Sequence, residues 1–342
     1  MFKFLVHKFQ VLLRWIAIWI GNIVSFFTHD MWFVKHDEQP KWKSRLLRDA
    51  KIVYLMMDTI ADQKIGFQIT ALAYQSMMSV VPFLAIAFYL TAGVGLSDQL
   101  EEFLYANVNN ERLINALMNA ANNILTTAES GLFGFISMLT FAWILIWLML
   151  SVRRVFNNVW KVEKEQKFLK SFGIGFGVLL LSPFVILLFF SGTVFYSHVL
   201  GLIFPDNLFL SNEFRSFLSW AMFTLVAILM LSLMFKYIPG TKVQYRHALK
   251  GAIIAGITFA LVQYLYLETQ ILVAKLSAVY GVLAALPLFM LWLNLGWTII
   301  LYGAELTYAF QNWQEYEKNI QQLDQEIDQD RELFRRPFKR KE

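Results

Sequence analysis

The stretch "YGVLAALPLFMLWLNLGWTIILYGAELTYA", Tyr280 to Ala309, decides the class of protein to which this chain belongs. Most of it is apolar, over more than the roughly 20 residues that a helix needs to cross a hydrocarbon core of ~30 Å. Near its end stands one acid, Glu305. The role of that acid depends on its depth in the bilayer, and hence on how the whole chain crosses the membrane.

The composition of the whole chain agrees with a membrane protein. Of its 342 residues, 57% are hydrophobic and only 16% are charged, whereas a soluble domain usually carries about 25% charged residues. The chain has no cysteine, which excludes thiol catalysis, disulfides and thiolate metal sites. No two histidines stand three or four residues apart, so no helical zinc pair exists and we expect no metal site.

Six long apolar segments recur along the chain, and each is long enough to cross the bilayer as a helix. They comprise residues 67–96, 131–150, 172–204, 217–238, 248–268 and 282–308. Polar and apolar residues nowhere alternate strictly enough for barrel strands, and helices satisfy their own backbone groups in lipid. We therefore predict an all-α integral membrane protein with six transmembrane helices.

The basic residues of the loops predict the orientation. Lysine and arginine gather in segments 35–64, 151–171, 236–250 and 311–342. The three remaining loops hold one basic residue each: Arg112, Arg215 and Lys275. Basic loops stay on the cytoplasmic side, so both termini are predicted inside, N-in/C-in. This rule also explains the net charge of +5; we expect no nucleic-acid partner, and anionic inner-leaflet lipid is the natural partner of these loops.

Segments outside the six spans complete the predicted organisation. Residues 9–27 are long enough to span, but basic residues on both sides favour an interfacial helix at headgroup depth. The loop 97–130 has the apolar spacing of one or two amphipathic helices on the outer face. We predict an interfacial helix with a basic cytoplasmic segment (1–50), a membrane domain (51–312) and a polar cytoplasmic tail (313–342).

The depth of Glu305 follows from its distance along the last span. It lies about 35 Å from Val282 along a helix that rises 1.5 Å per residue, at the inner edge of the hydrocarbon. Arg153 and Arg154 follow the second span at the same edge. One interpretation is an ion pair with these arginines, or a side chain that reaches water. The other is an acid that lines an inward-facing cavity as a proton or substrate site.

Further polar residues and prolines lie inside the predicted spans. A single polar side chain in a span is commonly a hydrogen-bond partner between helices. Together, with prolines in three spans that free backbone carbonyls, these groups predict a polar cavity between helices. The candidate cavity-lining residues are Tyr74, Gln75, Ser79, Pro82, Pro183, Gln263, Pro287, Asn294 and Glu305. No phosphate-binding loop and no H-E-x-x-H or G-x-S-x-G motif is present, so we expect no cofactor and no enzyme.

Four stretches of the chain are specific in combination. They are "ITALAYQSMMSVVPFL" (69–84), "RRVFNNVW" (153–160), "KYIPGTKVQYRHALKGAIIAG" (236–256) and "YGVLAALPLFMLWLNLGWTIILYGAEL" (280–306). With them, about residues 50–312 resemble the YihY/BrkB family of bacterial inner-membrane proteins, also filed as "ribonuclease BN-like". The resemblance implies six spans in the inner (plasma) membrane. A metal-dependent nuclease needs clustered His and Asp or Glu ligands facing water, which this sequence lacks, so the ribonuclease label does not fit.

The resemblance implies no settled activity, and two hypotheses follow. The first is a transporter or flippase-like carrier of an amphipathic envelope component, a lipid or glycolipid, which the resemblance implies and the intramembrane polar groups support. Without an ATP site, such a carrier would be passive, ion-coupled or driven by a partner. The second is a non-transporting scaffold that organises envelope machinery through its outer loop and tail. Whether the chain forms a homo-oligomer stays open.

Overall fold

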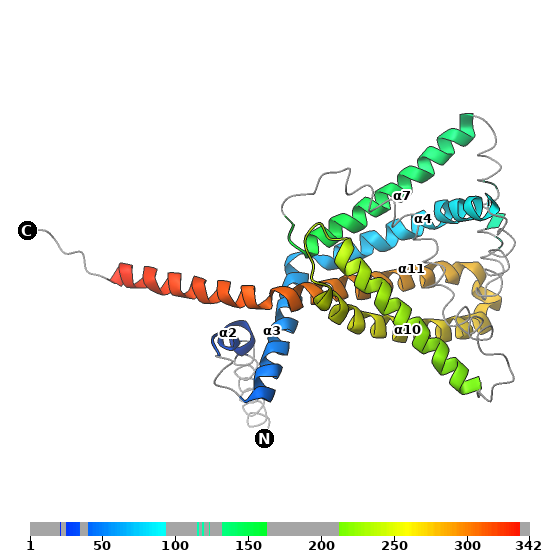
Figure 1. The fold of residues 1–342 in the computed structure, drawn as a ribbon. Helices are drawn as coiled ribbons and strands as arrows, with labels where there is room; N and C mark the ends of the chain where they lie inside the picture. Colours follow the sequence, from blue (N-terminus) through cyan, green and yellow to red (C-terminus); the bar gives the residue numbers. More distant parts are fainter. Residues whose placement is uncertain are drawn as a thin grey trace, which may run out of the picture. The chain divides into compact units, whose positions relative to one another are not determined.

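The computed structural model describes residues 25–34, 40–93, 132–162 and 212–335, together with a few isolated positions: Gly21, Asn115, Met118, Asn119 and Asn123. Every regular element within these ranges is helical (Figure 1). The elements are η1 (Phe26–Asp30), α2 (Met31–Phe33), α3 (Lys41–Asp62), α4 (Ile65–Gly93), α7 (Leu132–Val159), α10 (Asn212–Tyr237) and α11 (Tyr245–Arg335). For this part of the chain, the predicted all-α class is confirmed.

Four described segments are long and apolar enough to cross a membrane: Leu139–Val159, Ser216–Tyr237, Tyr245–Thr269 and Pro287–Ile327. They overlap four of the predicted spans, and α4, a helix of 29 residues, covers most of a fifth, 67–96. The predicted span 172–204 lies outside the described residues, as do most of the segment 9–27 and of the loop 97–130. Six spans and the N-in/C-in topology therefore stay predictions.

Helix α11 contains two predicted spans and folds back on itself. A straight helix would separate Gly251 from Gly303 by about 78 Å at 1.5 Å per residue, yet a Cβ added to Gly251 would lie 2.9 Å from the carbonyl oxygen of Gly303. Trp292 Nε1 also donates a hydrogen bond to Gln263 Oε1 at 2.8 Å. The reversal lies between Gln263 and Trp292, so the first arm (245–269) and the second arm (287–307) run antiparallel (Figure 1).

The chain forms two compact units. Unit 1 comprises Met1–Thr59 and Tyr308–Glu342, and unit 2 comprises Ile60–Thr307. The N-terminal segment and the polar tail, which lie at opposite ends of the sequence, therefore belong to one unit. The predicted boundaries at residues 50 and 312 stay predictions.

Unit 2 contains α4, α7, α10 and the two arms of α11. Helices α4 and α7 lie side by side (Figure 1). Phe259 of the first arm connects α10 to the second arm, because its ring centroid lies 6.3 Å from that of Phe223 and 6.5 Å from that of Trp292. A Cβ on Gly256 would come within 2.5 Å of Ile228 Cγ1, so only glycine permits this approach of the first arm to α10. Small residues at crossings are how membrane helices approach closely.

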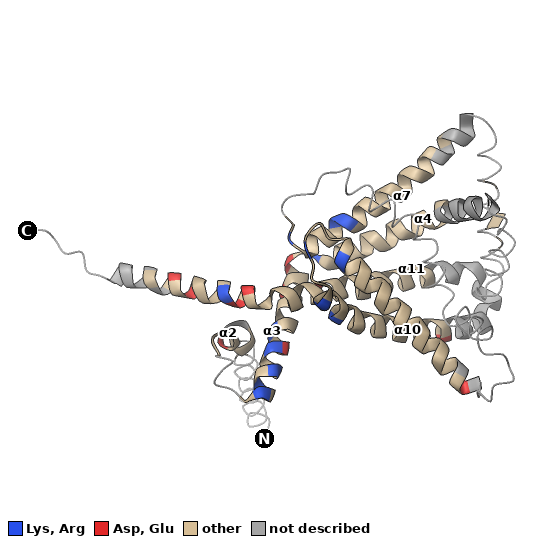
Figure 2. Cartoon of the chain, in the orientation of Figure 1, with Lys and Arg blue, Asp and Glu red and all other residues tan. Residues whose placement is uncertain are grey.

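The outside of unit 2 suits a lipid environment along the helices and water at their ends. Large apolar side chains are exposed on every helix, among them Phe67, Trp143, Phe217 and Leu261, and soluble monomers rarely expose so much apolar surface. In Figure 2, the basic residues near the end of α7, at the end of α10 and at the start of the first arm lie at one end of the bundle. This basic end carries Arg153, Arg154, Lys236, Arg246 and Lys250.

Unit 1 packs α3 against residues 308–335 of α11, here called the tail helix, around the buried Trp32. The ring of Trp32 contacts those of Tyr54 and Tyr316, with centroids 5.8 and 5.1 Å apart. Gln321 Nε2 donates to the carbonyl oxygen of Trp32 at 2.8 Å, and Tyr316 donates its hydroxyl to Asp58 at 3.0 Å. The sequence predicted only a polar tail here; in the structure, one side of the tail helix forms part of the core of this unit.

Candidate functional site

Glu305 lies in the interior of the bundle at its basic end. Its side chain is fully buried. Gly303 stands two residues before Glu305 and Thr307 two residues after it. Both pack against the first arm, since a Cβ on Gly251 would lie 2.9 Å from the carbonyl oxygen of Gly303 and would meet the hydroxyl of Thr307. A Cβ on Gly303 would also lie 2.8 Å from the ring of Phe235, which precedes Lys236. Glu305 therefore lies at the level of the end of α10, while its depth at the inner edge of the hydrocarbon stays a prediction.

The face of the second arm that carries Glu305 points toward α4. Residues 297, 301 and 305 recur every four positions and share one helix face. Trp297 Nε1 donates to Ser76 Oγ on α4 at 2.9 Å. Because the two helices run in opposite directions (Figure 1), this bond sets their register and places Glu305 near the level of Gln68.

Helix α4 supplies buried amide groups on this side of the bundle. Gln68 Nε2 donates to the carbonyl oxygen of Gln63 at 2.9 Å. The side-chain oxygens of Gln68 and Gln75 are buried and accept no hydrogen bond within the described part of the chain. A buried polar atom without a partner costs about 1–3 kcal/mol, so these oxygens are places where a water or a polar ligand group would be stabilised.

Several of the predicted cavity-lining residues already have partners among their neighbours. Buried Ser79 donates its hydroxyl to the carbonyl oxygen of Gln75 at 2.7 Å. Buried Gln263 accepts from Trp292, as described above, so its oxygen links the two arms of α11. Asn294 is half-buried, and its backbone carbonyl oxygen, rather than its side chain, accepts from the hydroxyl of Thr298 at 2.7 Å.

The remaining candidates are distributed over different surfaces. Pro82 is buried on α4, whereas Tyr74 and Pro287 are exposed. Pro183 lies outside the described residues. The structure thus brings Gln75 and Ser79 together on α4, near the helix face that carries Glu305; a single cavity lined by all nine candidates stays a prediction.

Arg153 and Arg154 lie within α7, which continues to Val159, well beyond the predicted span 131–150. Arg153 is half-buried and Arg154 is exposed. Both stand at the same end of the bundle as Glu305. Their predicted ion pair with Glu305 stays a prediction.

One link at the basic end was not predicted from the sequence. The backbone nitrogen of Gly240 donates to Asn157 Oδ1 at 2.8 Å, and the rings of Phe156 and Phe235 lie 6.4 Å apart. The stretches 153–160 and 236–256, noted separately in the sequence, therefore contact each other. No local pattern in either stretch indicates this pairing, because the two residues stand 83 positions apart.

No group of three or more His, Cys, Asp or Glu side chains could hold a metal ion within the ranges that the structure describes.

The four stretches noted in the sequence lie wholly within a longer match: a family model described as "Virulence factor BrkB" covers residues 56–328. The chain belongs to the BrkB family. The resemblance to YihY/BrkB proteins is thereby confirmed.

Similar proteins are named UPF0761 membrane proteins. One from Vibrio vulnificus (strain YJ016) is 27% identical over 273 residues, which cover 76% of this chain and 84% of the relative. One from Idiomarina loihiensis is 28% identical over 71% of this chain and 84% of the relative. One from Chlorobium limicola is 27% identical, and the match covers 77% of this chain but 58% of that longer relative. No solved structure matches the chain. These names establish a membrane protein and give no activity.

Proposed function

We propose that this member of the BrkB family is a transporter or flippase-like carrier for an amphipathic component of the bacterial envelope, a lipid or glycolipid, in the inner membrane. The observation that carries this proposal is the complete burial of Glu305 in a bundle whose outside is apolar. An ionisable side chain inside a membrane bundle is costly, and such residues mark pathways for protons, ions or substrates.

The surroundings of Glu305 support a site for a polar headgroup. On α4, the buried oxygens of Gln68 and Gln75 offer acceptors, and hydroxyl or amino groups of a sugar or headgroup would donate to them. At the same end, the basic residues of α7, α10 and the first arm would attract an anionic headgroup from the inner leaflet. Glu305 itself would bind a donor group or a coupling proton.

The test is native mass spectrometry of the gently extracted protein, with wild type beside Glu305→Gln and Glu268→Gln. Glu268 is an exposed acid on the first arm, so its variant controls for the loss of one negative charge. We expect a defined lipid or glycolipid on the wild type and on Glu268→Gln, and its loss from Glu305→Gln. Only bulk annular lipid on all three, with equal thermal stability, would refute the carrier.

A lipid-scrambling assay in proteoliposomes then measures the activity itself. With the lipid class that mass spectrometry identifies, carrying a headgroup fluorophore, wild type and Glu268→Gln should expose the inner-leaflet label to a membrane-impermeant quencher faster than empty liposomes. Glu305→Gln should match the empty liposomes. Because glutamine keeps the size of glutamate, a loss of transport without a loss of stability would point to the ionisable group.

A second candidate function is a non-transporting scaffold, and exposed apolar side chains on the tail helix support it. Leu323 and Ile327, four residues apart on one helix face, are 59% and 44% exposed, and such a pair suits a protein partner. If Leu323→Ser/Ile327→Ser abolished function in cells while Glu305→Gln left it intact, the scaffold would replace the carrier.

A further inference from the structure

The outer side of α3 carries an apolar stripe. Trp42, Leu46, Val53 and Met57 are 65%, 66%, 55% and 59% exposed. At 100° per residue they fall within about 60° around the helix axis. The opposite side of the helix forms the core of unit 1, with the buried residues Lys51, Ile52, Leu55 and Thr59. Helix α3 therefore has a packed side and a separate, exposed apolar side.

Basic side chains flank this stripe in the first turns of α3. Lys41, Lys43, Arg45 and Arg48 are all exposed, and Asp49 is the one acid between residues 41 and 49. By the same angular spacing, Lys43 lies about 40° beyond one edge of the stripe and Arg45 about 60° beyond the other. Arg48 lies instead on the packed side, at the angle of Leu55 and Thr59, and Asp49 lies between Arg45 and the stripe. An apolar stripe with basic residues along both edges is typical of a helix that lies in a membrane interface, where long basic side chains reach the phosphates.

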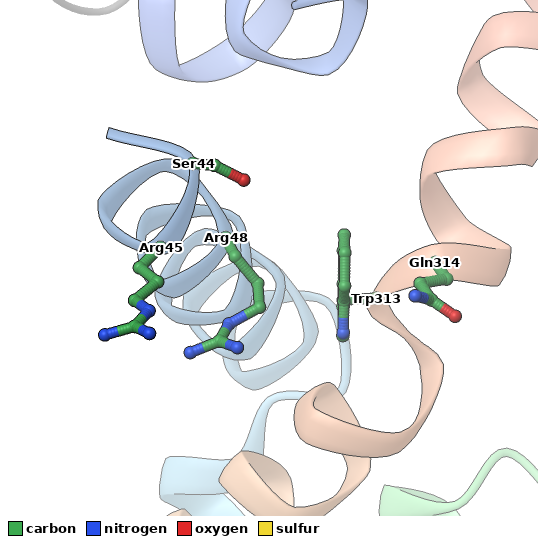
Figure 3. A pocket seen from close by; sticks show the side chains of 5 residues that line it. All are labelled: Ser44, Arg45, Arg48, Trp313 and Gln314. Atoms are coloured by element: carbon green, nitrogen blue, oxygen red, sulfur yellow. The ribbon is translucent and has the colours of Figure 1, made fainter. Parts of the chain in front are cut away.

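A pocket of about 240 Å³ lies next to these arginines, between α3 and the tail helix (Figure 3). It is lined by Ser44, Arg45, Arg48, Trp313 and Gln314. In Figure 3, Arg45 and Arg48 extend from α3 in the same direction, and the indole of Trp313 stands across from Arg48. Two guanidinium groups side by side can bind the oxygens of a phosphate with several charge-assisted hydrogen bonds.

Asp49, which pairs with Arg48, is an acidic residue that would repel a phosphate bound by Arg48. Arg48 donates to Asp49 Oδ1 from Nε at 3.0 Å and from Nη2 at 2.8 Å. Both side chains of this pair are largely exposed, at 45% and 60%, so the pair is weak and water screens the carboxylate. A guanidinium has five N–H donors, so Arg48 can keep this pair and still donate to a phosphate.

We propose that α3 is a membrane-surface helix: its apolar stripe enters the headgroup layer, and the Arg45–Arg48–Trp313 pocket binds the phosphate of an anionic phospholipid. Chain connectivity favours lipid over a soluble partner, because α3 ends at Asp62 and the long apolar helix α4 begins at Ile65. Charge favours the anionic leaflet, which attracts each nearby basic residue. The proposal goes beyond the carrier function and does not depend on it.

The first experiment measures the depth of α3. The chain has no cysteine, so Leu46→Cys carries a single nitroxide label, and Gln322→Cys, exposed on the tail helix, is the control. In nanodiscs of dioleoylphosphatidylglycerol, the label at position 46 should collide more with oxygen than with a water-soluble nickel complex, and the control should show the reverse. Equal nickel access at both positions would overturn the proposal. Shielding of position 46 from both reagents that grows with protein concentration would show a second copy instead, and would overturn it too.

The second experiment tests the pocket. Native mass spectrometry from nanodiscs of equal dioleoylphosphatidylglycerol and dioleoylphosphatidylcholine compares Arg45→Gln/Arg48→Gln with Lys161→Gln/Lys242→Gln, two exposed basic residues of unit 2 outside α7, α10 and the first arm, which lose the same charge. The preference for the anionic lipid should fall by more than about tenfold for each pocket arginine, as for a lost hydrogen bond to a charged group, and by no more than about fivefold for each control residue, the effect of general attraction to the leaflet. An equal fall in both variants would assign the preference to general charge attraction and overturn the pocket.

The third experiment distinguishes binding of a lipid headgroup from binding of a free anion. Inorganic phosphate is titrated into the wild type in uncharged detergent without phospholipid, and ³¹P line broadening reports binding. We expect no saturable broadening below tens of millimolar. Saturable broadening at lower concentration that disappears in Arg45→Gln/Arg48→Gln would make this a site for a soluble anion and overturn the lipid assignment. Glu305→Gln should change none of these results, which separates this proposal from the carrier function.

Discussion

Lys51 of α3 and Glu317 of the tail helix form an ion pair, with Nζ and Oε1 2.6 Å apart, and the lysine side chain is fully enclosed while the glutamate is 15% exposed. The two residues stand 266 positions apart in the sequence. The ammonium also lies 5.8 Å from the ring centroid of Trp32, so three distant segments meet at one charge. An enclosed ammonium depends on its carboxylate, because without it the lost hydration is not offset.

Glu317→Gln should therefore destabilise unit 1 by about 3 kcal/mol, as expected when one partner of a buried pair is removed. Hydrogen exchange followed by mass spectrometry should show faster exchange in peptides of α3 and of the tail helix. Lys51→Met/Glu317→Leu should recover most of the protection, because it removes both charges. Asp49→Asn, which breaks the exposed pair with Arg48, should cost less than about 1 kcal/mol; equal effects of Glu317→Gln and Asp49→Asn would contradict the role of burial.

Gly251→Ala should loosen the crossing between the two arms of α11. The added Cβ would meet the hydroxyl of Thr307 and lie 2.9 Å from the carbonyl oxygen of Gly303, and overpacking of this kind costs about 1–3 kcal/mol. Thermal unfolding in one detergent measures the loss. The control is Gly66→Ala in α4, where nothing lies within 4 Å of the added Cβ; alanine should there stabilise the helix by up to about 1 kcal/mol. A neutral Gly251→Ala would mean that the arms do not pack this closely.

The bond between Trp292 and Gln263 should contribute a modest coupling between the arms. In a double-mutant cycle with Trp292→Phe and Gln263→Met, we expect a coupling free energy of about 0.5–1.5 kcal/mol, the range for hydrogen bonds between membrane helices. Thr258→Val is the control, because its exposed hydroxyl donates only to Ile254 in its own helix and its removal should be nearly neutral. A coupling of zero would show that the indole and the amide find equivalent partners elsewhere.

Asn157→Leu should open the connection between α10 and α11. The change removes the acceptor of the Gly240 N–H, and a part-buried donor without a partner costs about 1–3 kcal/mol. Limited trypsin digestion at the exposed Lys242 reports the opening, and its rate should rise by about tenfold when cleavage follows the open population. Asn158→Leu, the same change at the next residue, should leave the rate near that of wild type, and equal rates for the two variants would disprove the role of this bond.

The elements of the bundle were more predictable than the relations between them. The helices over 217–238 and 248–268 were predicted because each is a run of about 20 apolar residues, which is a local property. The level of Glu305 at the inner edge of the hydrocarbon was predicted by counting along the last span, 282–308, since a helix rises by a constant 1.5 Å per residue, and it stays a prediction. The extension of α7 to Val159 was missed, because a helix continues past the hydrocarbon wherever its end packs against protein, and hydropathy does not report that.

By itself, the sequence determined the helical membrane class, the family and the basic end of the bundle, because all three depend on residue types within short windows. Only the tertiary structure decided that the N-terminal segment and the tail form one unit, that Lys51 meets Glu317, and that Asn157 holds Gly240. It also decided which side of α3 is packed and which is exposed. These relations join residues far apart in the chain, and a single polar side chain carries no periodic signal that would name its partner.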